Sequence, residues 1–316
     1  MAPQTSYARG TTIAPLLRET IGQNLTRTVT AHPDRDALVE VSSGRRWTYR
    51  EFVADVARIA TGLLDLGIRP GDRVGIWSPN TAEWTLVQYA TAQIGAVLVT
   101  INPAYRVEEL DYVLNQAGIR TVIAASSFKS SDYASMLETV RDNCPALHEV
   151  IIVGTTRWNA LAATEASTQA LGEIADTLSP DDPINIQYTS GTTGFPKGAT
   201  LTHANILNNG FFVGEGVHYS EHDRVCIPVP FYHCFGMVMG NLACTSHGAA
   251  MVIPHLGSTL LPHCVPSRTN TAPRCTGYRR CSSPNWPWTT STNSISVVYA
   301  PGSWPAHLAR NRSCAK

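Results

Sequence analysis

The ten residues YTSGTTGFPK, residues 188–197, combine the chemical groups that bind phosphate. Two glycines permit backbone angles closed to other residues, so consecutive amide N–H groups can turn toward one anion. Short hydroxyl groups add donors, and a lysine adds a mobile positive charge. Composition alone also allows a plain surface loop rich in Ser, Thr and Gly. We predict instead a loop that binds a polyphosphate through Thr189, Ser190, Gly191, Thr192, Thr193, Gly194 and Lys197.

Apolar segments on both sides of the loop favour this prediction. INIQ precedes it at residues 184–187 and predicts a strand, while LTHANIL follows at residues 201–207 and predicts a helix. A strand, a loop and a helix in this order would place the phosphate at the first turn of the helix. The spacing is not that of the P-loop, because Lys197 is followed by Gly198 rather than by Ser or Thr.

Helical and strand patterns alternate upstream of the loop and beyond it. Thr48 and Glu51 form a capping box before an apolar helix face that stops at Gly67. Asn80 and Glu83 predict a second helix cap. The alternation is typical of an α/β fold with a parallel sheet covered by helices on both faces. Strands are expected at residues 74–78, 96–100, 121–126, 149–153, 184–188, 225–229 and 249–253.

The composition fits a globular enzyme and argues against several other classes. The chain has 316 residues, with 24 basic and 24 acidic side chains. Zero net charge argues against nucleic acid or an anionic membrane surface as the main partner. Residues 225–267 carry no charged side chain, but prolines and glycines interrupt each apolar run before the ~20 residues of a membrane span. We therefore expect no membrane span, and a buried strand, helix and strand in this region.

The eight cysteines show neither metal-like nor disulfide-like spacing. Cys226, Cys234 and Cys244 stand apart without a CxxC pair. The first residues of the chain also lack the continuous apolar stretch of a secretory signal. We predict no metal site, free thiols and a location in the reducing cytoplasm.

Two motifs resemble those of a known family. The loop, continued as GATLTH through residue 203, resembles the phosphate loop of the adenylate-forming (AMP-binding) superfamily of acyl-CoA synthetases, luciferases and peptide-synthetase adenylation domains. The segment WTYREF to NQAGI, residues 47–119, is similar to the amino-terminal part of fatty-acid and medium-chain acyl-CoA ligases. A second motif is PFYHCFG, residues 230–236, and the resemblance places His233 near the carboxylate being activated. A core histidine bound to backbone groups is the alternative for His233.

The resemblance implies a two-step reaction. A fatty acid attacks the α-phosphorus of ATP to give acyl-AMP and pyrophosphate, and the thiol of CoA then displaces AMP to form a thioester. The first step brings an anion toward a triphosphate, so donors, lysine and Mg²⁺ must neutralise charge. The loop would hold the β and γ phosphates. The implied cofactors and partners are therefore ATP, Mg²⁺, CoA and a fatty acid, whose chain length the sequence leaves open.

Later motifs of the family are not found in this sequence. They comprise a Tyr-Gly-x-Thr-Glu segment whose Glu binds Mg²⁺, a Thr-Gly-Asp segment whose Asp holds the ribose, a hinge Arg/Asp region, and a C-terminal catalytic lysine. No Asp or Glu follows Asp223. We therefore expect the Mg²⁺ ligand to be missing and the chain to be an inactive fragment of an acyl-CoA ligase. The alternatives are a non-catalytic module that binds nucleotide or acyl groups, and an acyl-AMP ligase or adenylation domain with another acceptor.

The tail suggests a frameshift. From about residue 257 the chain is rich in Ser, Thr, Pro, Arg, Cys and Trp, without helical or strand periodicity. Reading its back-translation one nucleotide upstream permits a sequence with acidic residues and ligase-like patterning. Trp codons leave no choice in that frame: Trp286 before Pro287 gives Ala, Trp288 before Thr289 gives Asp, and both fit. We divide the chain into an N-terminal extension (1–19), an incomplete AMP-binding large domain (20–256) and an irregular, out-of-frame tail (257–316).

Overall fold

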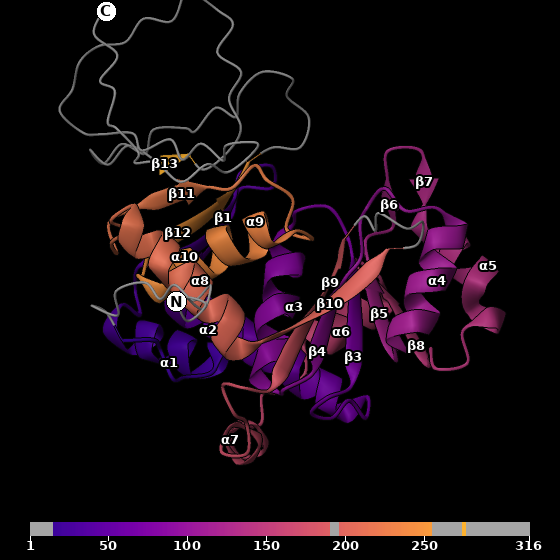
Figure 1. Ribbon diagram of the computed structural model, residues 1–316, viewed down its shortest axis with the longest axis horizontal. Helices are drawn as coiled ribbons and strands as arrows, with labels where there is room; N and C mark the ends of the chain where they lie inside the picture. Colours follow the sequence, from indigo (N-terminus) through magenta and orange to yellow (C-terminus); the bar gives the residue numbers. More distant parts are fainter. Residues whose placement is uncertain (1–14, 190–195, 255–273, 276–316) are drawn as a thin grey trace, which may run out of the picture.

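The computed structural model describes residues 15–189, 196–254 and 274–275. Among them, six strands form one sheet in the order β10-β9-β4-β3-β5-β8 (Figure 1). Five of these strands run parallel, and β10 runs antiparallel beside β9. The predicted parallel sheet is therefore confirmed here. Its strands are β3 (Arg73–Trp77), β4 (Val97–Thr100), β5 (Thr121–Ala124), β8 (Glu149–Ile152), β9 (Pro183–Thr189) and β10 (Lys197–Thr202).

The other strands of the described chain belong to a second sheet and a short hairpin. The second sheet has the order β13-β11-β12-β1-β2, and β2 alone is antiparallel to its neighbour. Its strands are β1 (Asp36–Glu40), β2 (Arg45–Thr48), β11 (Arg224–Cys226), β12 (Ala250–Ile253) and β13 (Arg274–Cys275). The hairpin consists of β6 (Ser127–Phe128) and β7 (Ser131–Asp132). The sequence patterns predicted β11 and β12 but missed β1 and β2.

Helices cover the sheets in layers. Figure 1 shows α3 between the two sheets, with α4 and α5 on the outer side of the six-stranded sheet. Along β5, Val122 and Ala124 belong to the apolar cluster under α4 and α5, while Ile123 belongs to the cluster that holds α2 and α3. Alternation with period two thus buries both faces of the sheet. The larger helices are α1 (Ile21–Ala31), α2 (Tyr49–Asp65), α3 (Ala82–Gln93), α4 (Val107–Ala117), α5 (Tyr133–Val140), α7 (Thr168–Ala175) and α8 (His203–Gly216).

Shorter helices connect these layers. A 3₁₀-helix, η1, follows α5, and a π-helix, η2, joins α9 to α10. Within residues 15–189, 196–254 and 274–275, no helix is long and apolar enough to cross a lipid bilayer. The predicted strand, helix and strand after residue 225 are confirmed by β11, the α9–η2–α10 segment and β12. The bounds of the shorter helices are α6 (Thr156–Ala162), η1 (Arg141–Asn143), α9 (Cys234–Gly236), η2 (Met237–Leu242) and α10 (Ala243–Ser246).

The first predicted helix cap is confirmed and the second is displaced by one residue. Glu51 N donates to Thr48 Oγ1, and Thr48 N donates to a Glu51 carboxylate oxygen, which is the expected capping box. At α3, however, the N-cap is Thr81, whose hydroxyl accepts from Trp84 N. Asn80 was predicted for this role but is buried and bonds to a distant segment of the chain. A tertiary contact therefore overrides the local pattern.

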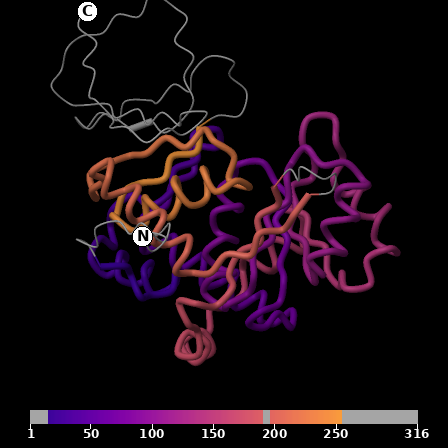
Figure 2. Tube along the Cα trace, viewed as in Figure 1, coloured from indigo at the N-terminus to yellow at the C-terminus, as the bar shows by residue number. Residues whose placement is uncertain are grey.

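Segments from opposite ends of the described chain pack side by side. In Figure 2 the indigo helix α1 lies beside the orange segment that contains α10. Thr28 Oγ1 donates to Thr245 O at 2.7 Å, and Ser246 Oγ donates to Asn24 Oδ1 at 3.3 Å. Such contacts between distant residues close the core on the α2 and α3 side of the six-stranded sheet.

His203, at the start of α8, links α1 to this core. Its side chain is 0% exposed, and Nδ1 accepts from Ile21 N at 3.1 Å. Nε2 has no hydrogen-bond partner among the described residues. Burial lowers the pKa of His203 to about 4, although Asp182 acts in the opposite direction. His203 is therefore neutral in the folded protein at neutral pH.

We expect His203 to make the fold sensitive to acid. In the unfolded chain His203 binds a proton near pH 6.5, whereas in the folded chain it does so near pH 4. The contribution of neutral His203 to the free energy of unfolding is therefore fully present above pH 6.5 and falls as the pH drops. His203 alone lowers the free energy of unfolding by about 3 kcal/mol between pH 7 and pH 4. Urea unfolding of wild type and His203→Gln across this range measures it. The variant should lose less stability, while His148→Gln, at an exposed position, should behave like wild type. Equal pH dependence in wild type and His203→Gln would contradict this assignment.

Candidate functional site

The predicted phosphate loop joins β9 to β10. Thr189 and Lys197, which flank the loop, face each other in the antiparallel register, and Thr189 Oγ1 lies 3.5 Å from Lys197 O. Both residues are exposed. The hairpin thus brings a hydroxyl group and an ammonium-bearing residue together at the base of the loop. The predicted residues between them, Ser190, Gly191, Thr192, Thr193 and Gly194, lie outside the described residues.

The prediction that a helix follows the loop directly is wrong. The chain forms β10 first, and α8 begins only at His203, after the N-cap Thr202. A strand of six residues spans about 20 Å, so the first turn of α8 lies away from the loop. Pairing with β9 decides the conformation, because β10 satisfies the backbone groups along an edge that would otherwise be open.

Contacts on β10 and β9 hold the hairpin against the sheet. A Cβ atom on Gly198 would lie 3.0 Å from Ile186 Cγ2 and 3.4 Å from Tyr188 Cζ, so the two strands approach closely at this glycine. The Tyr188 hydroxyl donates to Gln116 Oε1 in α4, and burial raises the pKa of that hydroxyl. Tyr188 is therefore a neutral anchor rather than a charged group. The hairpin is fixed at the carboxyl end of β9, the edge where open α/β sheets bind ligands.

His233 is exposed and caps the short helix α9. Its Nδ1 accepts from Phe235 N at 3.1 Å, so in the neutral ring the proton lies on Nε2, which can donate to an external acceptor. The alternative of a core histidine is wrong, because the ring is not buried. The neighbouring Cys234 is half-buried, and burial raises the pKa of its thiol, which disfavours the thiolate needed of a nucleophile.

The segment before His233 is held by a buried side chain. Asn80 Nδ2 donates to Val229 O at 2.8 Å, and Asn80 Oδ1 accepts from Phe231 N at 2.8 Å. The loop between β3 and α3 thereby satisfies backbone groups of an irregular segment. Sequence patterns offered Asn80 only as a helix cap, so this supporting role was missed.

The structure also connects the two motifs. Gln187, two residues before Thr189, has its Nε2 atom 2.8 Å from the sulfur of Met237, four residues after His233. Both side chains are buried. The phosphate-loop strand and the turn that carries His233 therefore belong to one packed unit. Nothing in the sequence pattern marked Gln187 as more than a strand residue.

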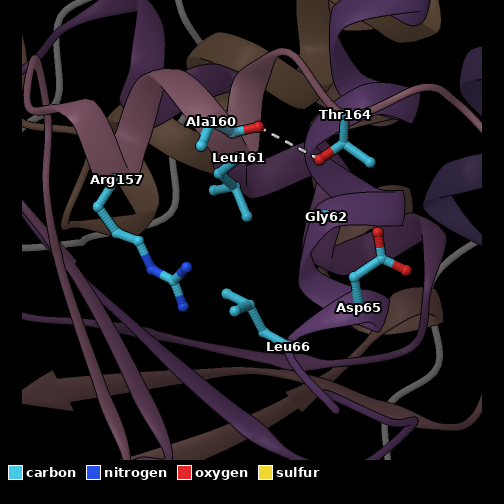
Figure 3. A pocket seen from close by; sticks show the side chains of 7 residues that line it. All are labelled: Gly62, Asp65, Leu66, Arg157, Ala160, Leu161 and Thr164. Carbon is cyan, nitrogen blue, oxygen red and sulfur yellow. Dashed lines mark hydrogen bonds between the residues drawn. The ribbon is translucent and has the colours of Figure 1, made fainter.

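A pocket between α2 and α6 is separate from this site. The two share no lining residue; Figure 3 shows this pocket, where Thr164 Oγ1 donates to Ala160 O at 3.4 Å. No group of three or more His, Cys, Asp or Glu side chains that could hold a metal occurs in residues 15–189, 196–254 and 274–275. The cysteines described there are free thiols, namely Cys144, Cys226, Cys234 and Cys244.

Comparison with protein families explains why these two motifs occur together. Residues 25–269 match the family of AMP-binding enzymes. The chain belongs to this family. The match includes both the β9–β10 hairpin and the segment around His233, and the mostly parallel α/β fold is that of the amino-terminal domain of adenylate-forming enzymes.

Among curated relatives, acyl-CoA ligases are similar to this chain. A mitochondrial medium-chain acyl-CoA ligase, ACSF2, of Danio rerio is 40% identical over 275 residues, which cover 80% of this chain and 45% of the relative. The putative acyl-CoA synthetase YngI of Bacillus subtilis (strain 168) is 41% identical over 261 residues, which cover 76% of this chain and 48% of the relative. The chain thus spans about half the length of these relatives. Since one is mitochondrial and one bacterial, the cytoplasmic location stays a prediction.

Solved structures show the same fold. A fatty acyl CoA synthetase of Mycobacterium tuberculosis superposes with a TM-score of 0.65 at 27% identity, over 74% of this chain and 44% of that protein. The predicted α/β fold and the resemblance to the adenylate-forming superfamily are therefore confirmed.

Proposed function

We propose that this chain supplies the triphosphate-binding half of a site that activates a fatty acid with ATP. The observation that carries the proposal is the packing of the β9–β10 hairpin, with Thr189 and Lys197 at its base, against the turn that bears His233. Hydroxyl and ammonium groups donate to anionic oxygens, so these residues fit a polyphosphate. The carboxylate that attacks ATP would approach from the His233 side.

Each residue has a distinct part in this proposal. The loop from Thr189 to Lys197 holds the β and γ phosphates and stabilises the charge on departing pyrophosphate. His233 donates through Nε2 to the carboxylate and orients it toward the α-phosphorus. The acyl chain would be fatty, as in the medium-chain ligases, and CoA would accept the acyl group. A different acceptor, as in acyl-AMP ligases, leaves these assignments unchanged.

Magnesium would shield the triphosphate in such a reaction. The donors present, a hydroxyl and an ammonium group, fit phosphate oxygens, but they include no carboxylate, the group by which proteins usually hold Mg²⁺ beside substrate phosphates. We therefore assign no Mg²⁺ ligand within residues 15–189 and 196–254. Because no Asp or Glu follows Asp223, we propose that this chain of 316 residues binds ATP but does not catalyse its reaction with a fatty acid.

Isotope exchange between pyrophosphate and ATP tests this proposal. We compare the chain of 316 residues with a chain that continues in the shifted reading frame from about residue 256, and both receive octanoate. We expect the shifted-frame chain to catalyse exchange and the chain of 316 residues to be at least about 100-fold slower, because losing a main charge-stabilising group costs a factor of this size. Comparable exchange by both chains would contradict the proposed inactivity. Absence of exchange and of ATP binding in both would contradict the proposed function.

A further inference from the structure

A π-helix, η2 (Met237–Leu242), follows directly after the motif that contains His233. π-Helices are rare, and single turns of this kind are frequent at functional sites. Gln88 of α3 spans this turn with one carboxamide: its Nε2 donates to Met237 O at 3.2 Å, and its Oε1 accepts from Asn241 Nδ2 at 2.8 Å. One side chain therefore ties the first residue of the turn to the fifth.

A second glutamine reaches the same turn from the phosphate-loop strand. Gln187 of β9 places Nε2 2.8 Å from the sulfur of Met237. Thioether sulfur is a weak acceptor, so the contact contributes through close packing as well as hydrogen bonding. The carbonyl oxygen of Met237 thus accepts from Gln88, and its sulfur contacts Gln187. The two glutamines come from different elements, α3 and β9.

These polar groups are buried where apolar side chains would ordinarily pack. Gln88 is 3% exposed, Gln187 is 5% exposed and Asn241 is 0% exposed. Burying a carboxamide costs free energy unless hydrogen bonds compensate, and a connected network in a low-dielectric interior specifies one geometry. Asn241 Oδ1 finds no partner among the described residues.

We propose that Gln88 and Gln187 are positioning residues that hold the His233 turn at a fixed place relative to the phosphate-binding hairpin. The inference rests on the proposed function, in which His233 orients the carboxylate and the hairpin holds the triphosphate. Small displacements between reacting groups cost large factors in rate, so a rigid link between the two motifs serves the first step. Gln187 provides the shorter path, because Thr189 lies only two residues further along β9.

Three variants of the full chain test the proposal. Gln88→Met and Gln187→Met retain unbranched side chains of similar size and remove the hydrogen bonds. Asn185→Leu is the matched control, because Asn185 is 1% exposed, points to the same face of β9 as Gln187, and donates to Leu98 O at 2.8 Å rather than to the His233 turn. Each variant therefore removes one buried carboxamide, but only the glutamine variants affect the turn.

The first readout is amide hydrogen exchange of residues 234–242. We expect exchange to accelerate by about tenfold in Gln187→Met, which loses one buried hydrogen bond, and by more than that in Gln88→Met, which loses two. In Asn185→Leu it should match wild type. Unchanged protection in the glutamine variants, or equal loss of protection in Asn185→Leu, would overturn the proposal.

The second readout is calorimetric binding of octanoate and of ATP. We expect the glutamine variants to bind octanoate about tenfold more weakly and ATP within about twofold of wild type. Parallel weakening of both ligands would indicate general loss of structure and overturn the positioning role. If wild type binds neither ligand, the proposed function fails, while hydrogen exchange still decides whether the glutamines hold the turn.

Discussion

Replacing Gly236 with alanine is expected to destabilise the fold by on the order of 3 kcal/mol, the upper part of the range for overpacked positions. Gly236 has φ −78° and ψ −57°, which alanine adopts without strain, so space alone decides the result. A Cβ atom there would lie 2.3 Å from Pro230 O and 2.9 Å from Phe231 Cα. These are backbone atoms that no rotamer change can move. The turn carrying His233 must shift, and urea unfolding measures the cost.

Gly172 supplies the matched control for this substitution. It lies on the exposed side of α7, and among described atoms nothing lies within 4 Å of the Cβ position. Alanine is favoured over glycine in a helix by up to about 1 kcal/mol, so Gly172→Ala should leave the free energy of unfolding unchanged or raise it. A loss below about 0.5 kcal/mol in Gly236→Ala would show that the turn relaxes around the added methyl group.

Replacing Lys197 with alanine is expected to weaken ATP binding by roughly 10- to 100-fold, the factor for losing one charge-assisted hydrogen bond. Lys197 stands across from Thr189 at the base of the loop and is exposed, so its removal leaves no cavity. The free energy of unfolding should change little. Isothermal titration of ATP into wild type and variant measures the ratio of affinities.

Lys129 provides a charge-matched control. It is exposed in the turn between β6 and β7, and its ammonium group lies 5.3 Å from the centroid of the Phe128 ring. Lys129→Ala removes the same charge from a position outside the β9–β10 hairpin, so ATP affinity should stay within about twofold of wild type. If both variants weaken ATP binding equally, ATP responds to net charge and the loop is not the phosphate site.

Local signals predicted much of this fold. The capping box of Thr48 and Glu51 depends on neighbours in the chain, and the buried apolar runs of β3, β4 and β5 mark central parallel strands without reference to partners. By contrast, β1 pairs with β12, more than 200 residues later, and its register is set by that distant strand. The same reason explains Asn80, whose partner at Val229 lies 149 residues away. Long-range contacts overrode equally plausible local patterns.

The candidate site divides in the same way. The loop and His233 stood out because their residue types and spacing are unusual, and both fall within residues 25–269, which match the AMP-binding enzymes. The hairpin was missed because only pairing with β9 shows that residues 197–202 form a strand before the helix predicted at residues 201–207. Gln88 and Gln187 were invisible in the sequence, since their contacts with Met237 cross 149 and 50 residues.

The central claim is that the β9–β10 hairpin binds the triphosphate of ATP. Calorimetric titration of ATP into the wild-type chain, in the absence and presence of pyrophosphate, tests it most directly, because pyrophosphate would occupy the subsite assigned to the loop. We predict saturable binding of one ATP per chain and competition by pyrophosphate. ATP binding that pyrophosphate leaves unchanged, or no binding of ATP at all, would contradict the claim.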